Sequence, residues 1–319
     1  MRTKRTLVLL LTIMLIVLSL TACQSEKSDP TETTTAAESA STAEKSDIYR
    51  FEDYESSEFF NIKKVDLSEE LSAKCTSYRF SYLSDGLKIN GYISIPDAFI
   101  QTQKPGKCLM YNHGGNRDYG KLEDDTTAKA CALCGRIVVA SQYRGCGGSE
   151  GQDQFGGDDL HDVIKLIDLC EKQFSFIDMD DFCVLGASRG GVMTFPAARQ
   201  DSRIKRVIAW SAVTDLFDSY ESRDDDMKQV LIETIGFTPQ ENPEEYEKRS
   251  AVYWADEIKV PVLFIHSKGD QLVSYRQAED LFTKLKDHTD SKFISHDDDN
   301  HCVLQPEDIS AINEWLNKH

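Results

Sequence analysis

Positive charge, cysteine and long apolar runs are all scarce in this 319-residue sequence. Lys and Arg number 36 against 54 Asp and Glu, a formal net charge of -18. This balance argues against nucleic acid or an anionic membrane surface as a partner, because both require clustered Lys and Arg. Nine irregularly spaced cysteines are too few for a small disulfide scaffold. By contrast, the 40% of hydrophobic residues is enough for a sizeable folded core.

The only extended apolar run lies at the N-terminus, where basic residues precede residues 7–20. It is shorter than the roughly 20 residues that a membrane-spanning helix needs, so it is typical of an export signal. The run ends in Leu20-Thr21-Ala22-Cys23, which resembles the lipobox of bacterial lipoproteins. That resemblance implies a signal peptide over residues 1–23, acylation of Cys23 and lipid anchoring to the outer face of the bacterial cell membrane. An uncleaved membrane anchor is the alternative, and it also places the body outside the cytoplasm.

Residues 24–47 are rich in Ser, Thr, Glu and Ala and lack apolar periodicity, which predicts a disordered tether. The remaining residues, 48–319, are long enough for one α/β domain. Apolar surroundings favour Cys108, Cys170 and Cys183 as small buried residues. The Cys131-x-x-Cys134 pair has no second pair nearby, which argues against zinc; a surface redox pair stays open.

Strand and helix patterns alternate along the body. Asp85-Gly86 between the alternating segments 78–84 and 87–95 predicts a β-hairpin. After it, βαβ units predict a mostly parallel sheet with helices on both faces and the hairpin at one edge. The expected strands are 107–112, 137–141, 181–186, 204–210, 260–267 and 293–295, and the expected helices are 121–134, 158–174, 189–199, 275–285 and 306–317. The acidic stretch 215–259 breaks this rhythm and indicates a lid or pocket wall.

The segment Gly186-Ala187-Ser188-Arg189-Gly190 places a G-x-S-x-G between an apolar strand and a helix. This context is that of a nucleophile elbow, in which the glycines permit a strained turn that exposes the serine. The alternative is an ordinary helix N-cap serine. A serine hydroxyl needs a base to remove its proton and an acid to orient that base. Asp270, just beyond a strand, is the preferred acid, with Asp215 as the alternative.

His301 lies in the loop between the last strand and the last helix, where the base must be, and His296 at the strand end is its competitor. His266 lies inside a strand and is expected to be a satisfied core residue. The remaining histidines are expected on polar surfaces or at the terminus: His161, His288 and His319. For the oxyanion hole, the predicted donors are the backbone N–H groups of Arg189 and of Gly115 in His113-Gly114-Gly115.

Two other features are expected to be structural. The Gly-rich loop 143–149 lacks the Lys-Ser/Thr of a P-loop, which favours a loop that shapes the crevice over a nucleotide site. The triplets 224–226 and 297–299 of Asp lack the spacing of a calcium loop. We therefore expect no metal and no cofactor.

Together, His113-Gly114-Gly115, the loop 143–148, the elbow 186–191, Gly269-Asp270 and His301 resemble the catalytic domain of the prolyl oligopeptidase (S9) family over about residues 78–318. The resemblance implies an α/β-hydrolase fold, a Ser188–Asp270–His301 triad, and Gly115 and Arg189 as oxyanion donors. Three departures are visible: too few residues precede the hairpin for the family's β-propeller, Asn116 replaces a usual Pro, and Asn300 stands where Gly is common.

The expected function is that of an extracytoplasmic serine hydrolase that cleaves short peptides, amides or carboxylic esters through an acyl-enzyme. Two alternatives remain open. One is a carboxylesterase or acyl transferase without peptidase activity, and the other is a catalytically inert ligand-binding surface lipoprotein. The expected partners are a small ester or short peptide and, through the lipid anchor, the membrane.

Overall fold

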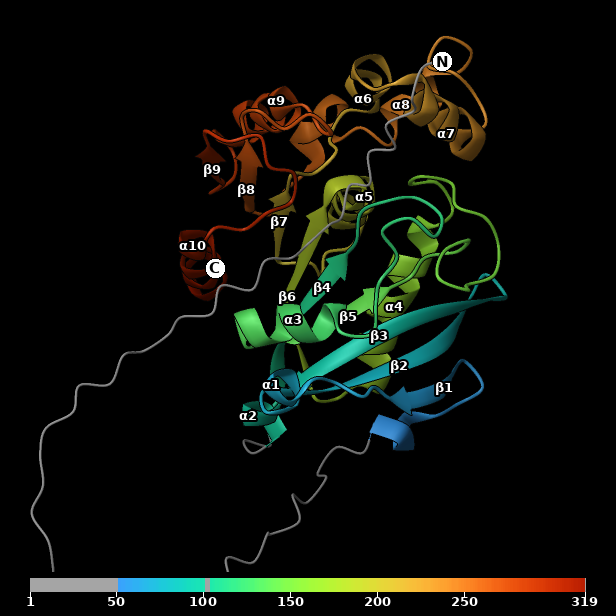
Figure 1. The fold of residues 1–319 in the computed structure, drawn as a ribbon, viewed down its shortest axis with the longest axis vertical. Coiled ribbons are helices and arrows are strands. Elements are labelled where there is room, and N and C mark those ends of the chain that lie inside the picture. Colours follow the sequence, from blue (N-terminus) through green and yellow to red (C-terminus); the bar gives the residue numbers. More distant parts are fainter. Residues whose placement is uncertain (1–50, 101–103, 319) are drawn as a thin grey trace, which may run out of the picture. The chain divides into compact units, whose positions relative to one another are not determined.

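The structure is a computed structural model that describes residues 51–100 and 104–318 (Figure 1). The predicted signal peptide 1–23, its Cys23 and the whole of the predicted disordered tether 24–47 lie outside the described residues. Within the described ranges, no helix combines the length and the apolar character that crossing a membrane requires.

Among the described residues, nine strands form one sheet in the order β1-β2-β3-β5-β4-β6-β7-β8-β9. From β4 to β9 all neighbouring strands are parallel, while β1, β2 and β3 pair antiparallel and β3 joins β5 antiparallel. The predicted mostly parallel sheet is confirmed. The strands are β1 (Phe59–Lys64), β2 (Cys75–Ser84), β3 (Leu87–Pro96), β4 (Gly106–Asn112), β5 (Ile137–Ser141), β6 (Ile177–Ala187), β7 (Arg206–Trp210), β8 (Val262–Ser267) and β9 (Lys292–His296).

The predicted hairpin is confirmed as β2 and β3. Asp85 and Gly86 both have positive φ, 50° and 77°, as a two-residue turn that follows the strand twist requires. The outermost strand at this edge is β1, however, which the sequence pattern did not indicate. A register shift between Phe60 and Lys63 and a positive φ at Asn61 interrupt its alternation, so no period of two can be read from it.

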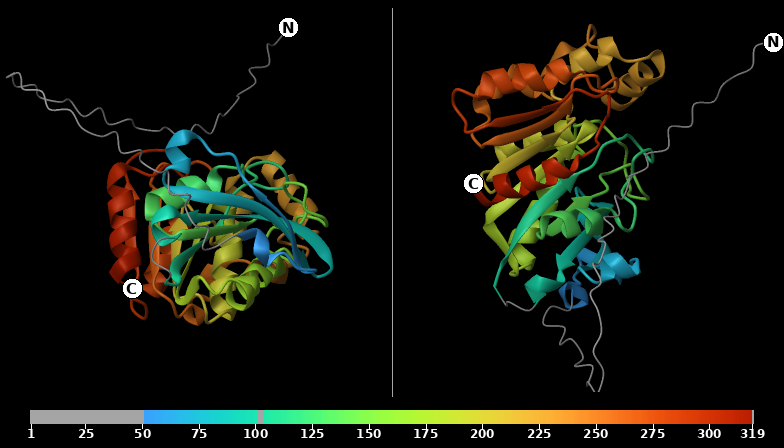
Figure 2. Two further views of the ribbon diagram at one scale, coloured as in Figure 1. Left: turned by 90° about the horizontal axis from the view of Figure 1, so that it is seen from below. Right: turned by 60° about the vertical axis from the view of Figure 1, so that its left-hand side comes forward.

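Helices cover both faces of the sheet, as predicted. Successive strand residues point to opposite faces, so these mostly apolar strands present an apolar surface on each side for helices to cover. On one face, Met110, Val139 and Val184 pack in a core with α4 (Leu160–Gln173), α5 (Gly191–Gln200) and α9 (Tyr275–Leu285). On the other, Leu109 and Val138 pack with α3 (Thr126–Cys134) and α10 (Pro306–Lys318), which lie side by side in Figure 2. Three short helical segments lie before and among the first strands: η1 (Phe51–Tyr54) before β1, α1 (Glu69–Ser72) between β1 and β2, and α2 (Asp97–Ile100) after β3.

Two predicted boundaries were wrong for reasons of tertiary structure. α3 begins at Thr126 rather than residue 121, because the Gln142 side chain accepts from the Leu122 N–H and donates to its carbonyl, which holds Leu122 in a loop. β6 begins at Ile177 rather than residue 181 despite the acidic stretch 178–181. Asp181 there is paired with Lys107, Arg136 and Arg206, none of which is near in sequence.

The acidic stretch 215–259 forms an insertion between β7 and β8. It contains α6 (Leu216–Ser222), α7 (Asp225–Ile235), α8 (Pro243–Glu247) and the turns η3 (Ala251–Tyr253) and η4 (Ala255–Glu257), grouped at the top of Figure 1. On α7, Glu233 forms an ion pair with Arg117 of the loop that follows β4. This contact links the insertion to the predicted oxyanion segment.

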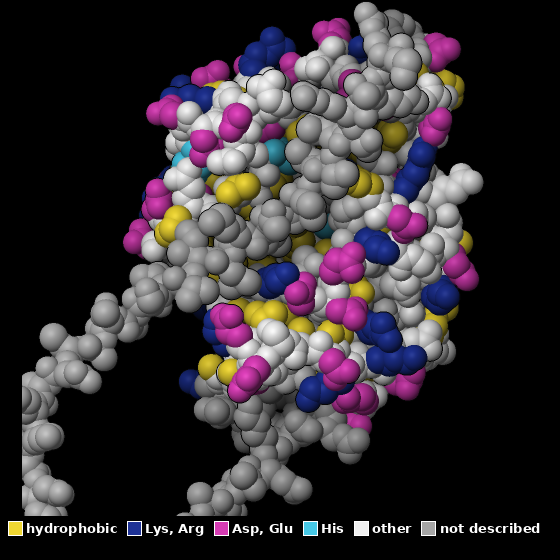
Figure 3. Space-filling view, in the orientation of Figure 1, with side chains coloured by type: hydrophobic (Ala, Val, Ile, Leu, Met, Phe, Trp, Pro, Cys, Tyr) yellow, Lys and Arg dark blue, Asp and Glu magenta, His cyan; other side chains and the backbone are white. Residues whose placement is uncertain are grey.

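Charged side chains on the face in Figure 3 are of both signs and interspersed. The Asp triplets have structural partners, as Asp224 caps α7 and Asp297 pairs with Lys268. Cys108, Cys170 and Cys183 are buried, as predicted. Cys131 is also buried, so the C-x-x-C of α3 is not a surface redox pair.

Candidate active site

The nucleophile elbow lies between β6 and α5, joined by the short turn η2 (Ser188–Gly190). Ser188 has a φ of 53°, a conformation that a residue with a Cβ rarely adopts. At Gly190 a Cβ would lie 2.0 Å from the Asn112 carbonyl oxygen, so any larger residue would push the elbow away from β4. The Val213 N–H also donates to the Ser188 carbonyl at 2.9 Å. The turn is thus fixed by β4 on one side and by the segment after β7 on the other.

The structure brings together the three residues named from the sequence, although 31 positions separate Asp270 from His301 and 113 separate Ser188 from His301. They follow the carboxyl ends of β6, β8 and β9, which meet at one edge of a parallel sheet. His301 Nε2 lies 2.9 Å from Ser188 Oγ, and His301 Nδ1 lies 2.7 Å from Asp270 Oδ2. Both are hydrogen-bonding distances.

The carboxylate of Asp270 determines which nitrogen of His301 carries the proton. Its second oxygen, Oδ1, accepts the backbone N–H groups of Leu272 and Val273 at 2.9 and 3.1 Å. Burial acts to raise the pKa of Asp270, but the hydrogen bonds from His266 and His301 outweigh it and hold that pKa well below its ordinary value. Asp270 is therefore ionised and accepts the Nδ1 proton, which leaves Nε2 free to accept from the serine hydroxyl.

His266 is a neighbour of the site that sequence reasoning placed in the core as a satisfied residue. It is buried, but its Nε2 donates to the Val273 carbonyl at 3.0 Å and lies 3.3 Å from Asp270 Oδ2. Its Nδ1 is buried without a partner. Because Nε2 faces two acceptors, it carries the proton, and two imidazoles therefore donate to the same oxygen of Asp270, Oδ2. Its position four residues before Asp270 was the available signal.

Cys302 is the second nucleophilic side chain close to His301. Its Sγ lies 3.6 Å from His301 Nε2 and 3.5 Å from the Trp210 carbonyl. Burial, reinforced by the charge of Asp270, raises the pKa of the Cys302 thiol well above its ordinary value. A thiol without thiolate character is a weak nucleophile, so Ser188 is the better placed of the two groups.

The loop after β4 carries the second predicted oxyanion donor. A Cβ on Gly114 would lie 2.8 Å from the Ser188 Cβ, so this loop lies directly against the nucleophile. The next residue, Gly115, has a φ of 79°, which turns the chain sharply there. The predicted donors, the N–H groups of Gly115 and Arg189, thus belong to segments that flank Ser188.

The alternative acid and base have other partners. Asp215 caps α6 by accepting the N–H groups of Phe217 and Asp218. His296 pairs with Asp308 of α10 at 3.0 Å. In the part of the chain that the structure describes, no three His, Cys, Asp or Glu side chains are grouped so as to hold a metal ion.

Comparison with known proteins identifies the family of this chain. Residues 123–319 match the prolyl oligopeptidase family, Peptidase S9. The chain belongs to this family. The uncharacterized peptidase YtmA of Bacillus subtilis (strain 168) is 32% identical over 212 residues, which cover 66% of this chain and 79% of YtmA. The predicted family, α/β-hydrolase fold and serine hydrolase class are confirmed.

Longer proteins match this chain over only part of their own length. Dipeptidyl-peptidase 5 of Aspergillus oryzae (strain ATCC 42149 / RIB 40) is 28% identical over 269 residues, which cover 75% of this chain and 35% of the relative. The solved structure of an acylaminoacyl peptidase in complex with Z-Gly-Gly-Phe-chloromethyl ketone has a TM-score of 0.61 and 25% identity, over 72% of this chain and 38% of that one. This S9 chain thus spans about a third of dipeptidyl-peptidase 5.

In this S9 hydrolase the loop 143–149 shapes the surroundings of the site, as expected. Tyr143 stacks on the ring of His113, with ring centroids 4.3 Å apart, and the Gly147 N–H donates to Asp118. His113 Nδ1 lies 2.7 Å from the Gly114 carbonyl and 3.1 Å from the Gly120 carbonyl. The His113 ring therefore connects the two ends of residues 114–120, the loop after β4 that carries the predicted donor Gly115 and is called the oxyanion loop below.

The lowered pKa of His113 predicts that the folded protein loses stability in mild acid. Burial, and then the charge of Arg189, lowers the pKa of His113 to about 4, against about 6.5 in an unfolded chain. Between these values the unfolded state binds more protons, so His113 contributes stability that is fully present above pH 6.5 and is lost as the pH falls toward 4. The full effect is on the order of 3 kcal/mol. Urea unfolding at a series of pH values measures it.

The variant His113→Asn is the control for this effect, since asparagine does not titrate. Its free energy of unfolding is expected to fall less steeply than that of the wild type between pH 6.5 and pH 4. Parallel pH profiles for the two proteins would contradict the assignment to His113.

Proposed function

We propose that this chain is an extracytoplasmic, lipid-anchored serine hydrolase that cleaves short peptides or amides through an acyl-enzyme at Ser188. His301 Nε2 takes the proton from Ser188 Oγ as the oxygen attacks the carbonyl carbon. Asp270 stabilises the imidazolium that forms, and the N–H groups of Gly115 and Arg189 stabilise the oxyanion. His301 then gives the proton to the leaving amine, and water, activated by the same imidazole, releases the acyl group.

The observation that carries this proposal is the position of the His301 ring between two oxygens, 2.9 Å from Ser188 Oγ and 2.7 Å from Asp270 Oδ2. The Asp270 carboxylate fixes one nitrogen as a donor and so makes the other an acceptor for the hydroxyl. An inert binding protein would not require this order of donors and acceptors, so the site favours catalysis over the binding alternative.

Peptides or amides are proposed as substrates because the relatives that match this chain carry peptidase names, including YtmA and dipeptidyl-peptidase 5. Carboxylic esters are the second candidate. The same triad cleaves them more easily, because an alkoxide leaves without the full protonation that an amine requires. The lipid anchor at Cys23 is supported by the lipobox-like segment 20–23 and by the apolar run before it.

A substrate panel on the full chain tests the choice of substrate. We expect turnover of aminoacyl and dipeptidyl p-nitroanilides as well as p-nitrophenyl acetate and butyrate, all lowered by at least about 10⁴-fold in Ser188→Ala. Turnover of the esters with no detectable anilide cleavage would replace the peptidase proposal by the esterase alternative. Turnover in Ser188→Ala at a rate close to that of the wild type would reject both.

A further inference from the structure

The side chain of Arg189, the residue after the nucleophile, is buried in an ion cluster that the mechanism above does not use. It is 2% exposed, and its Nη2 lies 2.6 Å from Asp153 Oδ1 and 2.5 Å from Asp159 Oδ2. Its guanidinium also lies over the Tyr143 ring, 4.9 Å from the centroid. This packing anchors the elbow to the loop between β5 and α4, because the backbone N–H of Arg189 moves with its side chain.

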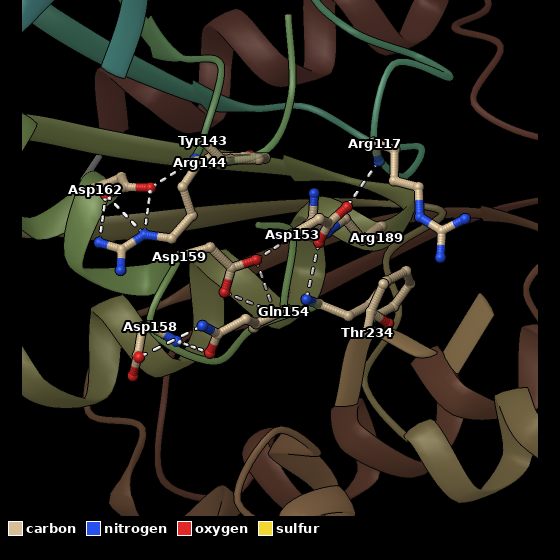
Figure 4. Close-up of polar contacts among 12 residues, drawn as sticks. Arg117, Tyr143, Arg144, Asp153, Gln154, Asp158, Asp159, Asp162, Arg189 and Thr234 are labelled. Atoms are coloured by element: carbon tan, nitrogen blue, oxygen red, sulfur yellow. Dashed lines mark hydrogen bonds and ion pairs between the residues drawn. The ribbon is translucent and has the colours of Figure 1, made fainter. Parts of the chain in front are cut away.

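Asp153 uses its other oxygen on the oxyanion loop. Its Oδ2 accepts the backbone N–H of Arg117 at 2.7 Å, two residues beyond Gly115. Arg117 has a φ of 51°, so the loop is held in a conformation that an unrestrained chain seldom adopts. In Figure 4 a dashed line joins the Asp153 carboxylate to the backbone nitrogen of Arg117, and Arg189 is drawn beside Asp153. A single carboxylate therefore contacts both segments that carry the predicted oxyanion donors.

The second carboxylate, Asp159, contacts Arg189 but binds a different part of the backbone. It accepts the Gly156 N–H at 3.0 Å, within its own loop. One carboxylate would be enough to balance the charge of Arg189, and a second buried carboxylate costs desolvation energy. Asp153 Oδ1 likewise accepts an N–H of its own loop, that of Phe155 at 2.9 Å. What Asp153 adds beyond charge balance and this local bond is the link to the Arg117 N–H.

We propose that Asp153 is a positioning residue of the oxyanion hole, which ties the loop of Gly115 to the elbow of Arg189 and so sets the spacing of the two N–H donors. The proposal rests on the function proposed above. An oxyanion hole acts only if its donors are held where negative charge develops. Loss of the tie should therefore weaken binding of the transition state and leave binding of the ground state largely unchanged.

The test is Asp153→Asn in the full chain. An amide has one acceptor oxygen in place of two, so it keeps at most one of the two links, while Asp159 still balances Arg189. We expect kcat for p-nitrophenyl acetate to fall about 10- to 100-fold, with KM changed less than about 3-fold. Affinity for an alkyl trifluoromethyl ketone, which forms a tetrahedral oxyanion on Ser188, should fall by the same factor as kcat/KM. If Asp153 served only the stability of the fold, ketone affinity and kcat/KM would not fall by the same factor.

Asp159→Asn is the matched control, because it removes a carboxylate from the same guanidinium without touching the oxyanion loop. Its kcat and ketone affinity are expected to stay within about 3-fold of the wild type. Equal losses in both variants, or a wild-type kcat in Asp153→Asn, would overturn the proposal. If Asp153→Asn does not fold, Asp153→Glu keeps the charge but displaces the oxygens by one methylene, and a wild-type kcat in that folded variant would also overturn it.

Labelling with a fluorophosphonate separates this proposal from the proposed function. A wild type that is not labelled at Ser188 contradicts the function itself. A labelled wild type, together with an unaffected Asp153→Asn variant, contradicts only the role of Asp153.

Discussion

Replacement of Ser188 by alanine is expected to lower kcat by about 10⁴- to 10⁶-fold, because no acyl-enzyme can form without the hydroxyl. The remaining rate over water would come from the oxyanion donors and from substrate binding. The fold should persist, since serine and alanine both carry a Cβ at the strained φ of 53°. Steady-state kinetics on the best substrate of the panel, together with the thermal unfolding temperature, measure both quantities.

Cys302→Ala is the matched control for Ser188→Ala, because Cys302 is the other nucleophilic side chain close to His301 Nε2, at 3.6 Å. It is expected to change kcat by only a few-fold. A large loss in Cys302→Ala with activity retained in Ser188→Ala would identify the sulfur as the nucleophile and contradict the elbow assignment.

Replacement of Asp270 by asparagine is expected to lower kcat by about 10³- to 10⁴-fold. An amide preserves the shape, but it presents no negative charge to the imidazolium and allows His301 to hold its proton on the wrong nitrogen. The pKa of Asp270 lies well below its ordinary value, so the wild-type carboxylate stays ionised in mild acid and the loss should be present at every pH assayed. kcat measured from pH 6 to pH 9 tests this.

Asp215→Asn serves as the control, since Asp215 is the other carboxylate that the sequence allowed. It caps α6 by accepting the N–H groups of Phe217 and Asp218, and the side-chain oxygen of asparagine can accept the same bonds. The variant should therefore keep the stability of the wild type and leave kcat within a few-fold. The reverse pattern, with Asp215→Asn inactive and Asp270→Asn active, would show that the wrong acid was chosen.

The parts of the fold that could be predicted are those in which local pattern and tertiary environment agree. Buried strands such as β5 and β8 each begin with four consecutive apolar residues, and Asp85-Gly86 specifies its turn by itself. β1 and the first residues of β6 could not be predicted. β1 pairs with β2 in an irregular register. The start of β6 depends on the ion pairs of Asp181 with Lys107, Arg136 and Arg206.

The residues of the site also fall into those that could be predicted from the sequence and those that could not. Ser188, Asp270 and His301 could be named because each follows the end of a strand in the required order, and the structure places them together. His266 and Asp153 were not named from the sequence as site residues. The one cue to His266 was its position four residues before Asp270, and a loop carboxylate such as Asp153 has no periodic signal. Their relation to the site arises only when β8 and the loop 143–159 pack against it.

The most direct test of the central claim is to treat the folded full chain with a fluorophosphonate probe and to map the adduct by mass spectrometry. The account predicts one adduct per chain, on the peptide that contains Ser188, and none in Ser188→Ala. A folded wild type that remains unlabelled, or an adduct on another residue, would contradict it.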